Sequence, residues 1–211
     1  MNASNSNVDA RRAGPRRRIF LAVPLARGLH EGVVAAIHGA VGGHDALRWV
    51  RPDMLHITLR FLGGMTAAEL NRAIRAAQAA AEPFIPFSVT FAGGGAFPSW
   101  RTPRVVWAGV GAGADGLRAL AEALDAALAK QRFPREPQRF HPHVTVARVR
   151  AGGPPPDLRP YAGRLTGSEA PVIGTQRVDA IVVMESMLHT SGARYEEVYR
   201  AAFRGGPSSH G

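Results

Sequence analysis

Two short histidine-threonine motifs are the residues of this sequence best suited to chemistry. His56-Ile57-Thr58 lies in an alternating apolar run over residues 55–62, and His143-Val144-Thr145 lies in a second such run over residues 140–149. In a β-strand, residues i and i+2 point to the same face, so each histidine projects together with its threonine. One such triplet is more simply explained as a structural histidine, but two in matching strands predict a paired-histidine site.

The chemistry that such a site suits is phosphodiester hydrolysis. Two imidazoles that face each other supply one general base and one general acid near neutral pH. One takes a proton from water, the other protonates the leaving oxygen, and the two threonine hydroxyls hold the phosphoryl oxygens for in-line attack. This reaction needs no metal. The residues alone do not decide which histidine is the acid.

The two triplets occupy matching places in an internal repeat. The intervals from Phe20 to His56 and from Val106 to His143 are nearly equal in length, and each reads strand, helix, histidine-threonine strand. Such a repeat predicts two lobes related by a pseudo-two-fold axis. The expected fold class is α+β, with two pseudo-symmetric lobes around a central cleft, each an antiparallel sheet with helices on the outside.

Apolar periodicity and turn residues predict the individual elements. Strands are expected at 19–23, 47–50, 55–62, 84–91, 104–110, 140–149, 176–187 and 195–203. Helices are expected at 25–41, 67–81 and 115–131, with a short turn of helix at 159–163. Thr66 and Glu69 form a predicted capping box. The pair Gly63-Gly64 is expected to end a strand, and the triplet Gly93-Gly94-Gly95 to be a flexible turn or bulge.

Composition and hydropathy predict which residues form the folded domain and where the protein is located. Residues 1–15 and 205–211 are predicted to be disordered tails, and residues 16–204 a single bilobal domain. Residues 17–21 look like a twin-arginine export signal, but a first core strand explains them better because the apolar run is short. No apolar run is long enough to span a membrane, and nothing requires more than a monomer, so we expect a cytoplasmic monomer without membrane association.

The sequence contains no cysteine, which excludes disulfides, thiolate zinc sites and a cysteine nucleophile among these residues. Its formal net charge is +10, and all but one of the 26 basic residues are arginine. A strongly basic surface attracts polyanions such as RNA. Charge alone is equally compatible with a soluble basic protein that has no nucleic-acid partner.

The two motif runs, Leu55 to Gly63 and Phe140 to Arg148, resemble those of the 2H phosphoesterase superfamily, in particular its RNA 2′,3′-cyclic phosphodiesterase (2′-5′ RNA ligase-like) branch. The likeness extends to residues 95–98 and 104–107 and to the closing segment from Glu185 to Tyr195, and covers roughly residues 17–203. It implies hydrolysis of an RNA 2′,3′-cyclic phosphate to a 2′-phosphate, without metal or cofactor.

The same resemblance implies the roles of individual residues. It makes His56 the proton donor, His143 the proton acceptor, and Thr58, Thr145 and Arg148 the groups that bind the phosphate. Strict strand alternation places Arg148 on the face of Val144, away from the cleft, unless the strand bends.

Two alternatives remain open from the sequence. One is a non-catalytic RNA- or nucleotide-binding module. The other is a metal-dependent hydrolase that uses His141 and His143 as ligands, although the next acidic residue downstream is Asp157. Among the aromatic residues, Trp100 is the better candidate to stack on a base because it lies in an arginine-flanked loop, whereas Trp107 is expected in the core.

Overall fold

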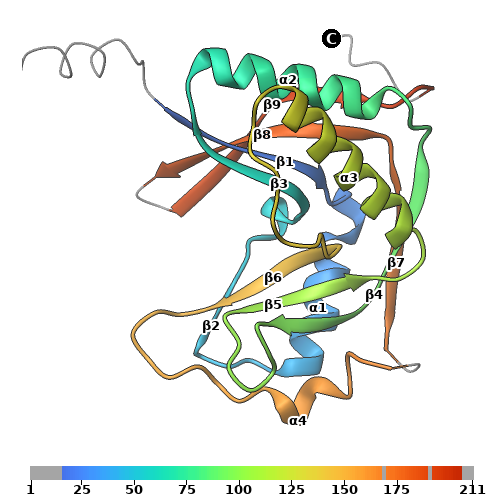
Figure 1. Ribbon diagram of the computed structural model, residues 1–211. Helices are drawn as coiled ribbons and strands as arrows, with labels where there is room; N and C mark the ends of the chain where they lie inside the picture. The colour runs from blue at the N-terminus through green and yellow to red at the C-terminus, as the bar shows by residue number, and fades with distance from the viewer. Residues whose placement is uncertain (1–15, 168–169, 190–191, 206–211) are drawn as a thin grey trace, which may run out of the picture.

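The computed structural model describes residues 16–167, 170–189 and 192–205 (Figure 1). The predicted tail at 1–15, and the predicted tail at 205–211 apart from Gly205, lie outside these residues. The strands are β1 (Arg17–Pro24), β2 (Leu47–Trp49), β3 (His56–Met65), β4 (Phe87–Phe97), β5 (Val105–Val110), β6 (His143–Val149), β7 (Val172–Val178), β8 (Ala180–His189) and β9 (Gly192–Ala202). The α-helices are α1 (His30–Val41), α2 (Ala67–Ala81), α3 (Ala114–Lys130) and α4 (Arg159–Ala162).

Over the described residues, nine strands form one curled antiparallel sheet in the order β7-β4-β5-β6-β3-β1-β8-β9, with β2 paired to the free side of β6. This order is pseudo-symmetric about its centre. The two central strands, β6 and β3, correspond to each other in the repeat, and so do their outer neighbours, β5 and β1. The α+β class and the antiparallel pairing agree with the prediction. The two lobes share one sheet, and the two histidine-threonine strands are neighbours at its centre.

The helix of each repeat packs against the strands of the opposite lobe. Helix α1 connects β1 to β3, yet it packs against β5, β6 and β7. Helix α3 connects β5 to β6, yet it packs against α2 and β3. Figure 1 shows α2 and α3 lying together over β1, β3, β8 and β9, and α1 lying on the half that holds β5 and β6. The lobes are therefore interlocked through the chain, and neither is built from one continuous segment.

Most predicted elements are present, including the capping box in which the Thr66 hydroxyl accepts from the Glu69 amide and the Glu69 carboxylate accepts from the Thr66 amide. The bulge expected at Gly93-Gly94-Gly95 is also present, as a register shift within β4. The Trp107 ring lies across Gly95, where a Cβ atom would collide with it, so this glycine serves close packing.

Two predictions about strand ends were wrong. The pair Gly63-Gly64 was expected to end a strand, but it continues β3 as far as Met65. Residues 176–187 were predicted as one long strand, but the chain breaks at Asp179 into β7 and β8, which pair with β4 and β1 respectively. The break occurs because the chain passes here from one lobe to the other. In the described part of the chain, no helix is both long enough and apolar enough to cross a membrane.

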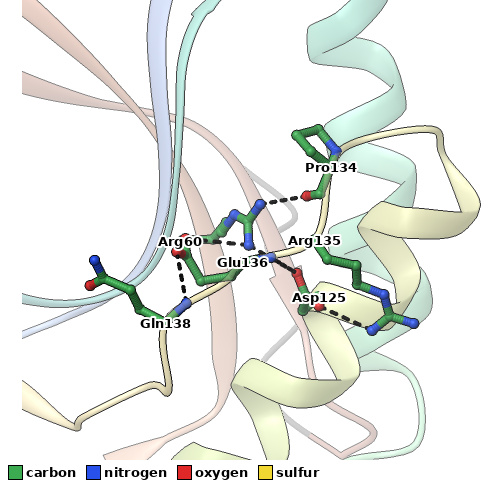
Figure 2. A network of polar contacts seen from close by, with 6 residues as sticks. All are labelled: Arg60, Asp125, Pro134, Arg135, Glu136 and Gln138. Atoms are coloured by element: carbon green, nitrogen blue, oxygen red, sulfur yellow. Dashed lines mark hydrogen bonds and ion pairs between the residues drawn. The ribbon is translucent and has the colours of Figure 1, made fainter.

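A buried arginine ties β3 to the loop that leads into β6 (Figure 2). The Arg60 side chain is only 7% exposed and forms ion pairs with Asp125 of α3 at 2.9 Å and with Glu136 at 3.3 Å. It also donates a hydrogen bond to the Pro134 carbonyl oxygen. Arg135 adds an exposed ion pair to the same aspartate. Arg60 thereby connects the strand of the first motif to the segment that delivers the second.

Replacing Arg60 with alanine is expected to lower the free energy of unfolding by about 1–3 kcal/mol, because the part-buried Asp125 carboxylate and the Pro134 carbonyl oxygen lose a charged donor while Arg135 still pairs with Asp125. The matched control is Arg135→Ala, which removes a 63% exposed partner of the same Asp125 carboxylate and is expected to cost about 0–1 kcal/mol. Urea denaturation monitored by circular dichroism measures both. Equal losses in the two variants would contradict the anchoring role of Arg60.

Candidate active site

The two histidine-threonine strands meet at one backbone pair, Ile57 with Val144. Both side chains of this pair are buried in the core. Extending the antiparallel register by one residue in each direction sets His56 opposite Thr145, and Thr58 opposite His143. All four side chains are half-buried on the face opposite to Ile57 and Val144. The structure thus brings together the four residues that the sequence predicted as a site.

Each histidine ring is held by the same backbone hydrogen bond. Nδ1 of His56 donates to the Met54 carbonyl oxygen at 2.8 Å, and Nδ1 of His143 donates to the His141 carbonyl oxygen at 2.7 Å. A carbonyl oxygen only accepts, so the proton of a neutral ring resides on Nδ1. In both imidazoles Nε2 is therefore the nitrogen available to accept or donate a proton. The bond also fixes the orientation of each ring.

Both histidines have lowered pKa values. Burial is the main cause of the lowered pKa of His56, and the charges of Arg148 and His143 lower it further, while the bond to Met54 opposes the shift. Burial also lowers the pKa of His143, with smaller contributions in the same direction from His141 and Arg148. His143 thus lowers the pKa of His56, and Arg148 lowers the pKa of both histidines, so the three side chains lie within electrostatic range of one another.

The orientation of Arg148 follows from a β-bulge. The register between β5 and β6 shifts at Val146, so that Val146 and Ala147 are both buried and Arg148 is exposed. The extra residue reverses the alternation and turns Arg148 to the face of His143 and Thr145. Arg48 of β2 lies directly across from Arg148 and is also exposed, which makes this end of the site basic.

The histidines lie among aromatic side chains that come from outside the two predicted motifs. His56 contacts Phe20 at 4.9 Å and Tyr195 at 5.2 Å between ring centroids. His143 contacts the edge of Phe97 at 5.1 Å, and the Trp107 ring lies at 6.0 Å. Phe20 can be placed next to His56 only when the register of β1 against β3 is known. The sequence alone therefore gives no direct signal that Phe20 belongs to the site.

These contacts correct the prediction for Trp107, whereas the stacking role of Trp100 stays a prediction. Trp107 was expected in the core, but its half-buried ring packs against Phe97 at 5.2 Å and His141 at 4.8 Å, beside His143. Trp100 was the preferred stacking candidate, but its half-buried side chain packs against the hydrophobic core, and no ring contact joins it to either histidine among the described residues.

His141, the second ligand of the alternative metal site, is exposed, and its ring lies 6.0 Å from that of His143. Within residues 16–167, 170–189 and 192–205, no three histidine, aspartate or glutamate side chains come together in a group that could hold a metal ion. The arrangement of donors around His141 and His143 therefore offers two nitrogen ligands and no acidic partner.

Comparison with known proteins agrees with this geometry. Residues 30–186 match the 2′-5′ RNA ligase superfamily. The chain belongs to this superfamily. Relatives in the superfamily include the RNA 2′,3′-cyclic phosphodiesterase of Aeropyrum pernix, which is 34% identical over 72% of this chain and 84% of its own length. The corresponding Methanothermobacter thermautotrophicus protein is 33% identical over 87% of this chain and 98% of its own length.

Solved structures place the fold in the same superfamily. A crystal structure from Thermus thermophilus matches 89% of this chain and 98% of its own, with a TM-score of 0.72 and 28% identity. Escherichia coli LigT complexed with 3′-AMP covers the same shares of the two chains, with a TM-score of 0.69 and 25% identity. The predicted resemblance to 2H phosphoesterases is thus confirmed at the level of the family and the fold.

The common influence of Arg148 on both histidines is open to a direct test. Replacing it with glutamine removes a positive charge beside both rings, so the pKa values of His56 and His143 are expected to rise. Nuclear magnetic resonance titration of the two rings measures the shifts. Arg150→Gln is the matched control, because Arg150 lies two residues away and donates to the Asp45 carbonyl oxygen. If only Arg150→Gln moves the two titrations, Arg148 does not face the site.

Proposed function

We propose that this protein is a metal-independent RNA 2′,3′-cyclic phosphodiesterase that opens the cyclic phosphate at an RNA end to a 2′-phosphate. The observation that carries the proposal is the pair of imidazoles on adjacent strands, each with Nδ1 bonded to a backbone carbonyl oxygen and Nε2 left for proton transfer. Membership of the 2′-5′ RNA ligase superfamily and the names of the curated relatives support the substrate class. All of these groups come from one chain, so the reaction requires only a monomer.

The proposed reaction consumes one water molecule. Nε2 of His143 accepts a proton from the water as its oxygen attacks the phosphorus atom. The bond between phosphorus and O3′ breaks, and Nε2 of His56 donates a proton to the departing oxygen. The products are a 3′-hydroxyl and a phosphate that stays on O2′. Two imidazoles from opposite lobes suit this in-line geometry, because the attacking and leaving oxygens lie on opposite sides of phosphorus.

The phosphate is held between the two strands in this proposal. The hydroxyls of Thr58 and Thr145 donate hydrogen bonds to the two non-bridging oxygens, and the guanidinium of Arg148 neutralises the charge that these oxygens gain in the transition state. The bulge at Val146 supports the role of Arg148, because it turns this side chain to the face of His143.

The assignment of acid and base rests on the family resemblance, which makes His143 the base and His56 the acid. His141 lies beside His143 and lowers its pKa by charge repulsion, which favours the neutral, proton-accepting ring. His56 lies against Phe20 and Tyr195, and Arg148 and His143 lower its pKa. A bound phosphate anion raises the pKa of both rings and so favours protonation of the ring that serves as the acid.

Alanine substitution tests the paired-histidine reaction. His56→Ala and His143→Ala are each expected to lower kcat by about 10²–10⁴-fold on an oligoribonucleotide that ends in a 2′,3′-cyclic phosphate, with excess EDTA present throughout. Chromatography that resolves 2′-phosphate from 3′-phosphate products measures turnover. His141→Ala is the matched control, because it removes the exposed histidine two residues before His143, and it is expected to change kcat by less than about tenfold.

The outcomes of this experiment separate the candidate functions. Loss of wild-type activity in EDTA together with a severe defect in His141→Ala supports the metal-dependent hydrolase. Tight binding of the oligonucleotide with no turnover by the wild-type protein supports the binding module. Wild-type turnover in either His56→Ala or His143→Ala overturns the paired-histidine mechanism.

The pH dependence of the reaction follows from the lowered histidine pKa values. The profile of kcat/KM reports the free enzyme, in which burial lowers the pKa of His56, so kcat/KM is expected to fall as pH rises through this lowered pKa, below the ordinary range of histidine. The bound phosphate raises the pKa of the acid, so kcat is expected to fall only at higher pH. Steady-state kinetics between about pH 5 and 9 measure both limbs. Coincident descending limbs would contradict the proposed effect of phosphate.

A further inference from the structure

The end of β1 has a neighbouring strand on only one side at the level of His56. Strand β1 pairs with β3 as far as Pro24, which lies opposite His56. On the other side, in the part of the chain that the structure describes, the pairing of β1 with β8 stops at Ala22, opposite Val182. The peptide groups after Ala22 therefore need other partners, beside the strand that carries a proposed catalytic residue.

The side chain of Gln176 supplies these partners. Its amide oxygen accepts a hydrogen bond from the Ala26 amide at 2.8 Å, and its amide nitrogen donates to the Pro24 carbonyl oxygen at 3.1 Å. One side-chain amide thus offers the donor and the acceptor that the backbone of an adjacent strand would offer. Gln176 is only 7% exposed, and it belongs to β7, which pairs with β4 in the opposite lobe.

The second lobe shows what this side chain replaces. Val23 and Ala108 lie opposite the two residues of the backbone pair that joins β3 to β6. The third residues after them, Ala26 and Gly111, therefore correspond to each other. The Gly111 amide donates to the backbone carbonyl oxygen of Thr90 in β4 at 2.9 Å. In the first lobe the equivalent acceptor is a side chain from the other lobe.

We propose that Gln176 is a positioning residue for His56, which it holds in place across the junction of the two lobes; this inference rests on the proposed function. The two peptide groups that Gln176 binds flank Leu25. The Leu25 amide donates to the Leu55 carbonyl oxygen at 3.0 Å, next to the Met54 carbonyl oxygen that accepts from Nδ1 of His56. Gln176 is therefore connected, through two backbone segments, to the hydrogen bond that fixes the tautomer of His56.

Loss of the Gln176 amide is expected to affect the rate of the reaction more than substrate binding. It breaks the link between β7 and the end of β1, so the backbone opposite His56 is free to shift. A misplacement of about 1 Å at reacting groups can lower a rate about 100-fold. Because the Gln176 side chain is buried and holds only backbone groups of β1 and the residue pair after it, the defect should appear in kcat and not in KM.

The kinetic test uses Gln176→Met, which removes both hydrogen bonds and keeps an unbranched side chain of similar size. On an oligoribonucleotide that ends in a 2′,3′-cyclic phosphate, kcat is expected to fall about 10- to 100-fold, with KM within about twofold of wild type. Thr175→Val is the matched control, because the exposed Thr175 hydroxyl, on the preceding residue of β7, bonds to Thr90 of β4. This control is expected to leave kcat and KM unchanged.

A spectroscopic test needs no turnover. Proton–nitrogen NMR correlation of the imidazoles reads which ring nitrogen carries the proton, and in wild type it should be Nδ1 in both His56 and His143. Gln176→Met is expected to give His56 a larger share of the Nε2–H tautomer and to leave His143 unchanged. Thr175→Val should change neither ring.

Gln176→Glu separates the hydrogen bonds from side-chain packing. A protonated glutamate has the same donor and acceptor as glutamine, whereas its carboxylate keeps the acceptor and repels the Pro24 carbonyl oxygen. Burial raises the pKa of the introduced carboxyl, so kcat of Gln176→Glu relative to wild type is expected to rise as pH falls through this raised pKa. The same ratio for Gln176→Met should not depend on pH.

The outcomes distinguish this inference from the proposed reaction. A folded Gln176→Met with wild-type kcat and the wild-type His56 tautomer overturns the positioning role, and so does an equal change in both rings, which indicates general loosening. If Gln176→Met does not fold, Gln176→Glu decides, and a ratio that does not change with pH overturns the role. A shift of the His56 tautomer alone supports it even if wild type has no turnover, in which case only the proposed reaction fails.

Discussion

The site depends on one backbone contact at the centre of the sheet. Ile57 of β3 and Val144 of β6 form the single paired position between the two histidine-threonine strands. Their buried side chains face the core, and this leaves the residues on either side of them to face each other from opposite strands. A misplacement of about 1 Å at reacting groups can lower a rate about 100-fold, so the two lobes must be held firmly at this contact.

A contact this short needs support from elsewhere in the chain. The Arg60 cluster anchors β3 to α3 and to the loop before β6. On the other side, the Gln176 side chain of β7 donates to the Pro24 carbonyl oxygen and accepts from the Ala26 amide, and Pro24 is the β1 residue that pairs with His56. The exchange of α1 and α3 between lobes adds packing across the same junction. Stability and alignment of the site are therefore produced by the same residues.

The sequence was sufficient to predict the pairing of the two motifs, since a period-two pattern and a repeat are visible without coordinates. It was insufficient to predict the orientation of Arg148, because the bulges at Val146 and Leu59 are not marked by any residue type that is typical of bulges. The packing role of Gly95 was out of reach for a related reason: it depends on the distant Trp107 ring. Long-range register decided these features, and local propensity carries no information about register.

The repeat also explains why the two halves of the site differ. Hydrolysis of one phosphodiester bond needs a donor on one side and an acceptor on the other, so two identical half-sites would serve it poorly. The backbone preserves the symmetry through equal hydrogen bonds at Nδ1 and equal bulges after each threonine. The side chains break it: His141 lies beside one imidazole and Tyr195 beside the other, and the fifth residue after the histidine is a cation, Arg148, in one strand and a phenyl ring, Phe61, in its counterpart. Symmetry thus positions the two imidazoles, and the departures from it give the two half-sites different surroundings.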